Sequence, residues 1–178
     1  LNENEQNFVP VKHKKDYELS SLPRSLKDAI LNFLICNCIR TIRGDGKKHR
    51  TMMINISSYN NVQESIKENV DLYLNTLRNT IFQYDKYGLE KFCKHPELKR
   101  LYEIYENDAF YNEKSDSFPF LSIKEQISFD KIQAKLWDEI QYFQSHIINN
   151  KYKGDQRFNY DNCRDYGARL IAIGGFVL

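Results

Sequence analysis

The chain has 178 residues, which is enough for one hydrophobic core and does not require a second. Its 26 basic and 24 acidic residues leave a net charge of +2, so whole-chain charge does not indicate a nucleic-acid partner. Four cysteines without a Cys-x-x-Cys pair favour reduced thiols, and no apolar run reaches the roughly 18 residues of a spanning helix. The sequence therefore predicts a cytoplasmic protein with no membrane partner.

Residues 1–22 are polar and form a predicted basic arm with a charged run at Lys12 to Lys15. We expect a helix from Pro23 to Arg43, because proline fits the first helical turn and the preceding serines can cap it. Apolar residues at a spacing of three and four give this helix a broad buried stripe. Its one polar member, Asn37, needs a hydrogen-bond partner, and Gly44 marks the end of the helix.

The next segments alternate between strand and helix patterns. A second basic cluster, Lys47 to Arg50, precedes a short apolar run from Thr51 to Ser57 that predicts a core strand. Helical spacing then continues from Val62 to Phe82. Two short helices are expected between residues 84 and 110, with breaks at Gly88 and Pro96.

The last third of the chain begins with a polar loop from Asn112 to Pro119. Helical spacing resumes from Ile123 to Phe143, and His146 to Asn149 is a candidate second strand. Lys151 to Asp165 reads as a loop or a short helix. The uncharged run from Leu170 to Ile173 predicts a strand buried on both faces of a parallel sheet.

Gly174 and Gly175 follow this strand directly, at the place where α/β proteins put their ligand loops. We therefore treat both glycines as candidates for a nucleotide loop. The chain then ends on three apolar residues, Phe176 to Leu178, so we expect a C-terminally truncated piece of a longer protein. The element order predicts an α/β segment over residues 23–178, with a small, mainly parallel sheet and a large helical insertion at about 62–143.

The candidate chemistry is sparse. Cys93 and His95 lack a second ligand pair for zinc. Glu97 and Lys99 match part of a metal-dependent nuclease pattern, but they lie in a helical segment where a solvated face is the simpler interpretation. The sequence has no Gly-x-Ser-x-Gly, no phosphate loop, and no evident partner for its four histidines. No cofactor is expected in this segment by itself.

Basic residues give the one indication of nucleic acid. Lys12 to Lys15 form one candidate phosphate-binding cluster, and a second lies around residue 47. Ordinary surface charge explains both clusters equally well. Aromatic residues between Phe82 and Tyr111 could stack on bases, but helical spacing is more typical of a core. The candidate nucleic-acid-binding residues of the second cluster are Arg40, Arg43, Lys47, Lys48 and Arg50.

Three segments together resemble the bacterial Z1 (Z-one) domain of candidate endonucleases. They are Ser21 to Ile30, His49 to Ser57 with the following Val62 and Gln63, and Arg169 to Gly175. His146 to Asn149 also resembles the family's Val-Val-Asn strand end. Two positions depart from the pattern: Asn55 stands where histidine is frequent, and Phe176 where a polar residue is common.

This resemblance implies an association with a superfamily-two helicase-like ATPase in restriction-modification or DNA repair. Thr51 to Ser57 would be the first strand of a second RecA-like lobe, and Leu170 to Gly175 the strand before a late helicase motif. The family continues with a Ser-Arg-Gly run whose arginine would reach ATP phosphates or nucleic acid. This chain ends at Leu178, before that run.

The resemblance makes DNA and the rest of the parent protein the expected partners, with ATP and a divalent metal in the parent. Because this segment lacks a phosphate loop, we expect it to be inactive alone in ATP hydrolysis and DNA cleavage. The competing hypothesis is a non-catalytic module whose helical block, Val62 to Phe143, docks a protein partner.

Overall fold

A computed structural model describes residues 9, 13–15, 17, 19–108, 111, 126–148 and 158–175. The chain divides into two compact units. The first contains 1–27, 47–75 and 142–178, and the second contains 28–46 and 76–141. The polar loop at 112–119, most of the loop predicted from 151, and the apolar end at 176–178 lie outside the described residues.

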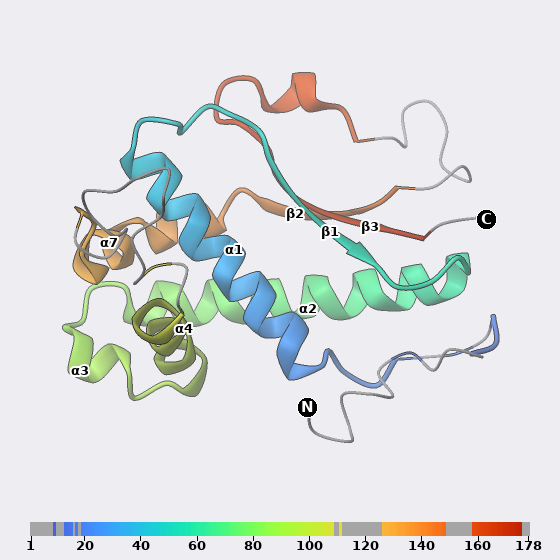
Figure 1. Cartoon of the computed structure of the whole chain (residues 1–178), viewed down its shortest axis with the longest axis horizontal. Helices are drawn as coiled ribbons and strands as arrows, with labels where there is room; N and C mark the ends of the chain where they lie inside the picture. Colours follow the sequence, from blue (N-terminus) through green and yellow to red (C-terminus); the bar gives the residue numbers. More distant parts are fainter. Residues whose placement is uncertain are drawn as a thin grey trace. The chain divides into compact units, whose positions relative to one another are not determined.

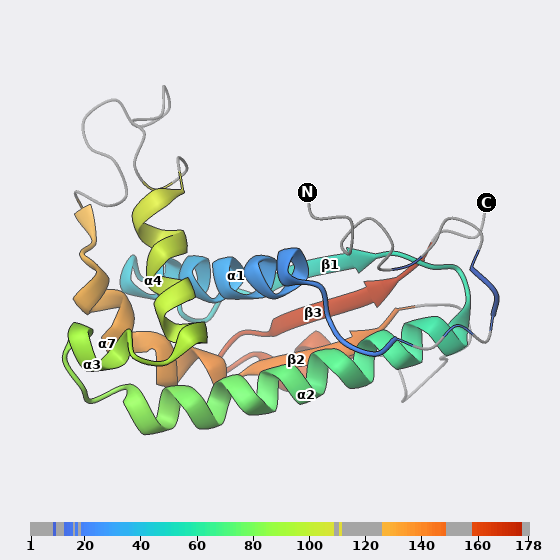
Figure 2. The same cartoon turned by 90° about the horizontal axis from the view of Figure 1, so that it is seen from below.

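A three-stranded parallel sheet with the order β1-β3-β2 is the framework of the first unit. Its strands are β1 (Arg50–Asn55), β2 (Phe143–Ile147) and β3 (Arg169–Gly174). Figures 1 and 2 show β3 between the other two strands. Every residue of β3 is buried, as expected for a central strand covered on both faces. The predictions of two strands in one sheet and of a mainly parallel sheet are confirmed.

The two faces of the sheet differ in their neighbours. The Ser145 hydroxyl donates to Asp71 of α2 (Asn60–Tyr84), so the face that carries Ser145 is directed toward α2. Gln144 and His146 belong to the opposite face, because successive side chains of a strand alternate. On β1 this opposite face carries three exposed residues, Thr51, Met53 and Asn55. It is contacted by the short helix η2 (Tyr160–Cys163), since the Tyr160 hydroxyl lies 3.1 Å from Thr51 Oγ1.

The second unit is helical and contains most of α1 (Arg24–Ile42), the end of α2, α3 (Leu89–Phe92), α4 (Pro96–Asn107) and α7 (Phe129–Ile140). Phe129 packs edge-on or tilted against Phe92, Tyr102 and Tyr105, with ring centroids 4.9–5.8 Å apart. Because Phe92 and Tyr105 are almost fully buried, these aromatic residues form a core. Asn37, the polar member of the α1 stripe, donates to the Phe33 carbonyl at 2.7 Å.

Helix boundaries agree with the sequence except for the helix predicted from Ile123 to Phe143, which is interrupted at residues 127 and 128, so that α7 begins only at Phe129. The breaks predicted at Gly88 and Pro96 are present, and His95 caps α4 by accepting from the Glu97 amide at 3.3 Å. The prediction of a helix through Phe143 is wrong, because α7 ends at Ile140 and Phe143 opens β2. The second strand predicted at His146 therefore begins three residues earlier. Phe143, Ser145 and Ile147 lie on one face, as every second residue of a strand does.

Candidate nucleic-acid interface

The predicted basic residues fall in both units. Arg40 and Arg43 belong to the second unit, at the end of α1. Arg40 pairs with Asp45 at 3.4 Å, and exposed Arg43 donates to Gln126 Oε1 at 3.1 Å. Both guanidinium groups therefore already have polar partners in their own unit. Lys47, Lys48 and Arg50 belong to the first unit instead.

Lys47 and Lys48 are exposed in the turn that precedes β1. Arg50 differs from them, because only 4% of it is accessible and it is the first residue of β1. Arg50 is therefore not part of the exposed surface of this turn, and its assignment to nucleic acid stays a prediction. Its place in the alternation of β1 directs it to the same sheet face as Met52 and Ile54, away from solvent. The exposed cations of this turn are thus Lys47 and Lys48.

The turn at Lys47 and Lys48 is fixed by the segment that leads into β3. The Ala168 amide donates to His49 Nδ1 at 2.9 Å, and the Arg50 amide donates to the Ala168 carbonyl at 2.9 Å. Gly167 lies directly against the turn, because a Cβ built on it would be 2.7 Å from the Lys48 carbonyl oxygen. The backbone that carries the two lysines is therefore held in one position rather than extended as a solvated loop.

Arg169, the first residue of β3, supports the segment that packs against the lysine turn. Its Nη1 donates to the carbonyls of Tyr166 and Gly167, both at 2.7 Å, and the residue is 3% exposed. Its guanidinium also lies 5.8 Å from the ring centroid of Tyr142. A buried cation is tolerated where hydrogen bonds satisfy it. Arg169 thus stabilises the turn at Gly167 and, through it, the position of Lys47 and Lys48.

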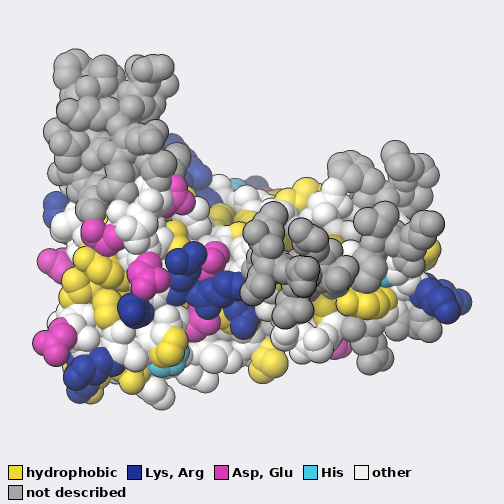
Figure 3. Space-filling model, turned by 60° about the horizontal axis from the view of Figure 1, so that its bottom comes forward, with side chains coloured by type: hydrophobic (Ala, Val, Ile, Leu, Met, Phe, Trp, Pro, Cys, Tyr) yellow, Lys and Arg dark blue, Asp and Glu magenta, His cyan; other side chains and the backbone are white. Residues whose placement is uncertain are grey.

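Charge elsewhere on the described surface is mixed. On the face drawn in Figure 3, Lys and Arg side chains lie among Asp and Glu side chains. Such mixing matches the net charge of +2. Any attraction for phosphate must therefore come from a local feature, because interspersed charges of opposite sign weaken the field at a distance.

The glycine pair lies where β3 ends, at the carboxyl edge of the sheet. A Cβ on Gly175 would lie 1.8 Å from the Ser57 carbonyl oxygen, whereas one on Gly174 would meet its nearest atom at 3.2 Å. The close approach that Gly175 permits is therefore to the chain's own backbone after β1. Glycine is required at 175 for packing whether or not a ligand binds, and the nucleotide-loop assignment stays a prediction.

A family comparison matches the Z1 domain over residues 25–178. The chain belongs to the Z1 domain family. Comparisons with curated proteins and with solved structures gave no match. Within the described residues of this Z1 domain, no helix is long and apolar enough to cross a membrane.

One histidine of the Z1 domain has a partner that sequence reasoning missed. His13 Nε2 lies 2.7 Å from Ser57 Oγ, and its ring packs edge-on against Tyr59 at 5.4 Å. Ser57 Oγ also accepts from the Tyr59 amide at 3.1 Å. The contact between His13 and Ser57 joins the N-terminal arm to the loop that follows β1. Because 44 residues separate His13 from Ser57, local sequence patterns do not reveal the contact.

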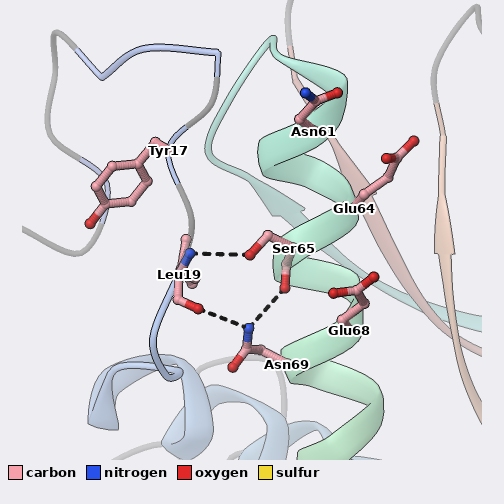
Figure 4. Close-up of a pocket in the computed structure, with 7 residues that line it drawn as sticks. All are labelled: Tyr17, Leu19, Asn61, Glu64, Ser65, Glu68 and Asn69. Carbon is pink, nitrogen blue, oxygen red and sulfur yellow. Dashed lines mark hydrogen bonds between the residues drawn. The ribbon is translucent and has the colours of Figure 1, made fainter.

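The first unit also contains a cavity of about 440 Å³ between the arm and α2. Figure 4 shows Leu19, one of the lining residues, held against α2: its amide donates to Ser65 Oγ at 3.1 Å, and Asn69 Nδ2 donates to its carbonyl at 3.4 Å. Glu64 and Glu68 also line the cavity, and none of the described residues in its lining is Lys or Arg. Two carboxylates repel an anion. The cavity therefore does not suit a nucleotide phosphate.

The metal and nuclease candidates have structural roles on α4. His95 caps the helix, Glu97 is in its first turn, and Lys99 lies 3.7 Å from Glu103. These positions agree with the prediction of a helix face. Among the described residues, no group of three or more His, Cys, Asp or Glu side chains is arranged to hold a metal ion. All four cysteines are free thiols.

His146 on β2 belongs to the face away from α2, but charged groups of that helix still act on its pKa. Burial lowers its pKa first, nearby Lys67 lowers it further, and Asp71 acts in the opposite direction. Lys67 Nζ and Asp71 Oδ2 form an ion pair at 2.6 Å. Because desolvation disfavours the imidazolium form, His146 is held neutral to a lower pH than an exposed histidine. At neutral pH His146 therefore contributes an uncharged ring to this face of the sheet.

Proposed function

We propose that this Z1 domain is the DNA-contacting part of a bacterial cytoplasmic protein that uses ATP to act on DNA. In this proposal the parent is a candidate endonuclease of a restriction-modification or repair system. Its helicase-like remainder supplies the phosphate loop, the ATP and the divalent metal, and the Z1 sheet is part of a RecA-like lobe. The observation that carries the proposal is the fixed turn with exposed Lys47 and Lys48 beside β1.

A fixed turn favours phosphate binding for an entropic reason. Immobilising a flexible loop on binding costs free energy, so cations on a backbone that is already ordered retain more of their interaction with the ligand. Each lysine that neutralises a phosphate also releases condensed counterions. Two lysines by themselves give weak binding that does not depend on sequence. Specific recognition would require the rest of the parent protein.

The test is a salt titration of DNA binding by the purified chain. We expect binding that weakens steeply with salt, and the Lys47→Ala/Lys48→Ala variant should lower the slope of log K against log salt by about two units. The matched control is Lys86→Ala/Lys94→Ala, which removes two exposed lysines of the second unit. An unchanged slope in the first variant, or an equal change in both, would refute the assignment of this turn.

A second candidate function rests on the helical unit. Phe82 is 64% exposed, and its ring lies 5.0 Å from that of Trp137. An exposed phenylalanine packed on a partly exposed tryptophan is typical of a protein-docking surface. Because Trp137 is the single tryptophan, its fluorescence would report docking of the parent's remaining domains. A Trp137 shift on adding those domains, without any DNA binding by the Z1 domain, would favour the interaction-module hypothesis.

A further inference from the structure

Four rings form a continuous row across the sheet face that is directed away from α2. We name His49, Tyr160, Phe158 and His146 the aromatic strip. The ring centroids of His49 and Tyr160, of Tyr160 and Phe158, and of Phe158 and His146 are each 4.9 Å apart. All four residues belong to the first unit. The strip crosses the sheet from the β1 side to the β2 side.

The β1 end of the aromatic strip is open and rigid. His49 is exposed and Tyr160 is 38% exposed, whereas Phe158 and His146 are only partly accessible. The Tyr160 hydroxyl lies 3.1 Å from Thr51 Oγ1, and His49 Nδ1 accepts from the Ala168 amide at 2.9 Å. Because Nδ1 accepts, the neutral His49 ring carries its proton on Nε2. Both exposed rings are therefore held in place by contacts with the sheet and with the segment that leads into β3.

The two exposed lysines are continuous with this open end. Lys47 and Lys48 immediately precede His49, and the backbone that carries all three is fixed by Gly167 and Ala168. Positive charge beside exposed aromatic rings is the combination that binds single-stranded nucleic acid, in which phosphates meet cations and bases meet rings. A protein partner would not require these two features side by side.

We propose that the aromatic strip is a binding site for single-stranded DNA, with unpaired bases stacking on Tyr160 and His49 and phosphates contacting Lys47 and Lys48. The inference rests on the proposed function and extends it from DNA in general to unpaired strands. Base faces are covered by their neighbours in a duplex, so a duplex can use the lysines but not the rings. The aromatic strip therefore predicts a preference for single-stranded over duplex DNA, which the lysines alone would not give.

The first arm of the test compares three ligands of equal length: an oligo-dT strand, an abasic strand with the same phosphates, and a duplex. We expect the oligo-dT strand to bind more tightly than the abasic strand, because only oligo-dT offers bases for stacking. Equal affinity for the two single strands would refute the inference, while binding of the duplex would leave the proposed function standing. Absence of binding to all three ligands would refute both.

The second arm uses variants of Tyr160. Tyr160→Leu should weaken oligo-dT binding by about 5- to 150-fold, which corresponds to about 1–3 kcal/mol for one stacked base. Binding of the abasic strand and the duplex should not change. Tyr160→Phe keeps the ring and loses only the hydroxyl contact with Thr51, so it should weaken oligo-dT binding much less than Tyr160→Leu does, and it serves as a folding control.

Tyr87→Leu is the matched control, because Tyr87 is 41% exposed and lies in the second unit. It should leave all three affinities unchanged. The inference is wrong if Tyr160→Leu and Tyr87→Leu have equal effects. It is also wrong if Tyr160→Leu weakens the abasic strand and the duplex as much as oligo-dT, because the ring would then only support the fold around the lysines.

Discussion

Gly167→Ala is the substitution that most directly tests how the lysine turn is held. Gly167 has a φ of +74°, and an added Cβ would lie 2.7 Å from the Lys48 carbonyl oxygen and 2.8 Å from Arg169 Nη1. The first contact is with backbone, which cannot rotate away as a side chain can. Gly44 provides the matched control, because its φ is +93° and an added Cβ would meet nothing within 4 Å.

The two substitutions share one cost and differ in another. A left-handed backbone with a Cβ costs about 1–2 kcal/mol, and this applies to both positions. Crowding adds about 1–3 kcal/mol when packed atoms must shift, and it applies only to Gly167. Alanine also lowers the entropy of the unfolded chain by similar amounts at both positions. We therefore expect Gly167→Ala to lower the free energy of unfolding by about 1–3 kcal/mol more than Gly44→Ala.

Urea unfolding followed by circular dichroism measures this difference, and hydrogen exchange locates it. Total stabilities of about 5–15 kcal/mol make the extra loss measurable. In Gly167→Ala the amide of Arg50 should exchange faster, because that amide donates to the Ala168 carbonyl beside the altered turn. A loss in Gly167→Ala no larger than in Gly44→Ala, with unchanged exchange at Arg50, would refute the packing that places Lys47 and Lys48.

The glycine pair and the buried histidine provide two further predictions. Gly175→Ala should destabilise the protein more than Gly174→Ala in thermal unfolding, because the added Cβ would lie 1.8 Å rather than 3.2 Å from its nearest backbone atom; equal melting temperatures would contradict the close approach to Ser57. The pKa of His146 is lower in the folded protein than the ordinary histidine value of about 6.5. Below pH 6.5 the unfolded state therefore binds a proton at this residue more readily than the folded state does. Its contribution to stability is complete above that value and is lost as the pH falls, so His146→Gln should flatten the acid side of the stability curve; an unchanged slope would contradict this prediction.

The strands at the centre of the sheet could be predicted because their sequences are locally unambiguous. The uncharged run at Leu170 to Ile173 and the alternating run at Thr51 to Ser57 have few other stable uses. The order β1-β3-β2 could not be predicted from them, because the pairing of Arg50 with Arg169 joins residues far apart in the chain. The error at Phe143 has a local cause. Ile140 and Phe143 are spaced like two helical positions, and no glycine or proline separates α7 from β2.

The candidate site was predicted only in its charged part. Runs such as Lys47 and Lys48 are visible in the sequence, but the burial of Arg50 is not, since arginine is rarely inside a protein unless it has partners. The aromatic strip leaves no local trace for a similar reason. His49 and Tyr160 are separated by more than one hundred positions and meet only because β1 and β3 are adjacent. Their contact depends on the sheet rather than on either segment alone.

The position of the lysine turn connects the fold to the proposed chemistry. The turn lies where β1 begins, whereas Gly174 and Gly175 lie where β3 ends. Because the strands are parallel, these are opposite edges of the same sheet. Ligands of open α/β sheets bind at the carboxyl edge, so a nucleotide in the parent and a DNA strand on the lysines would not compete for one surface.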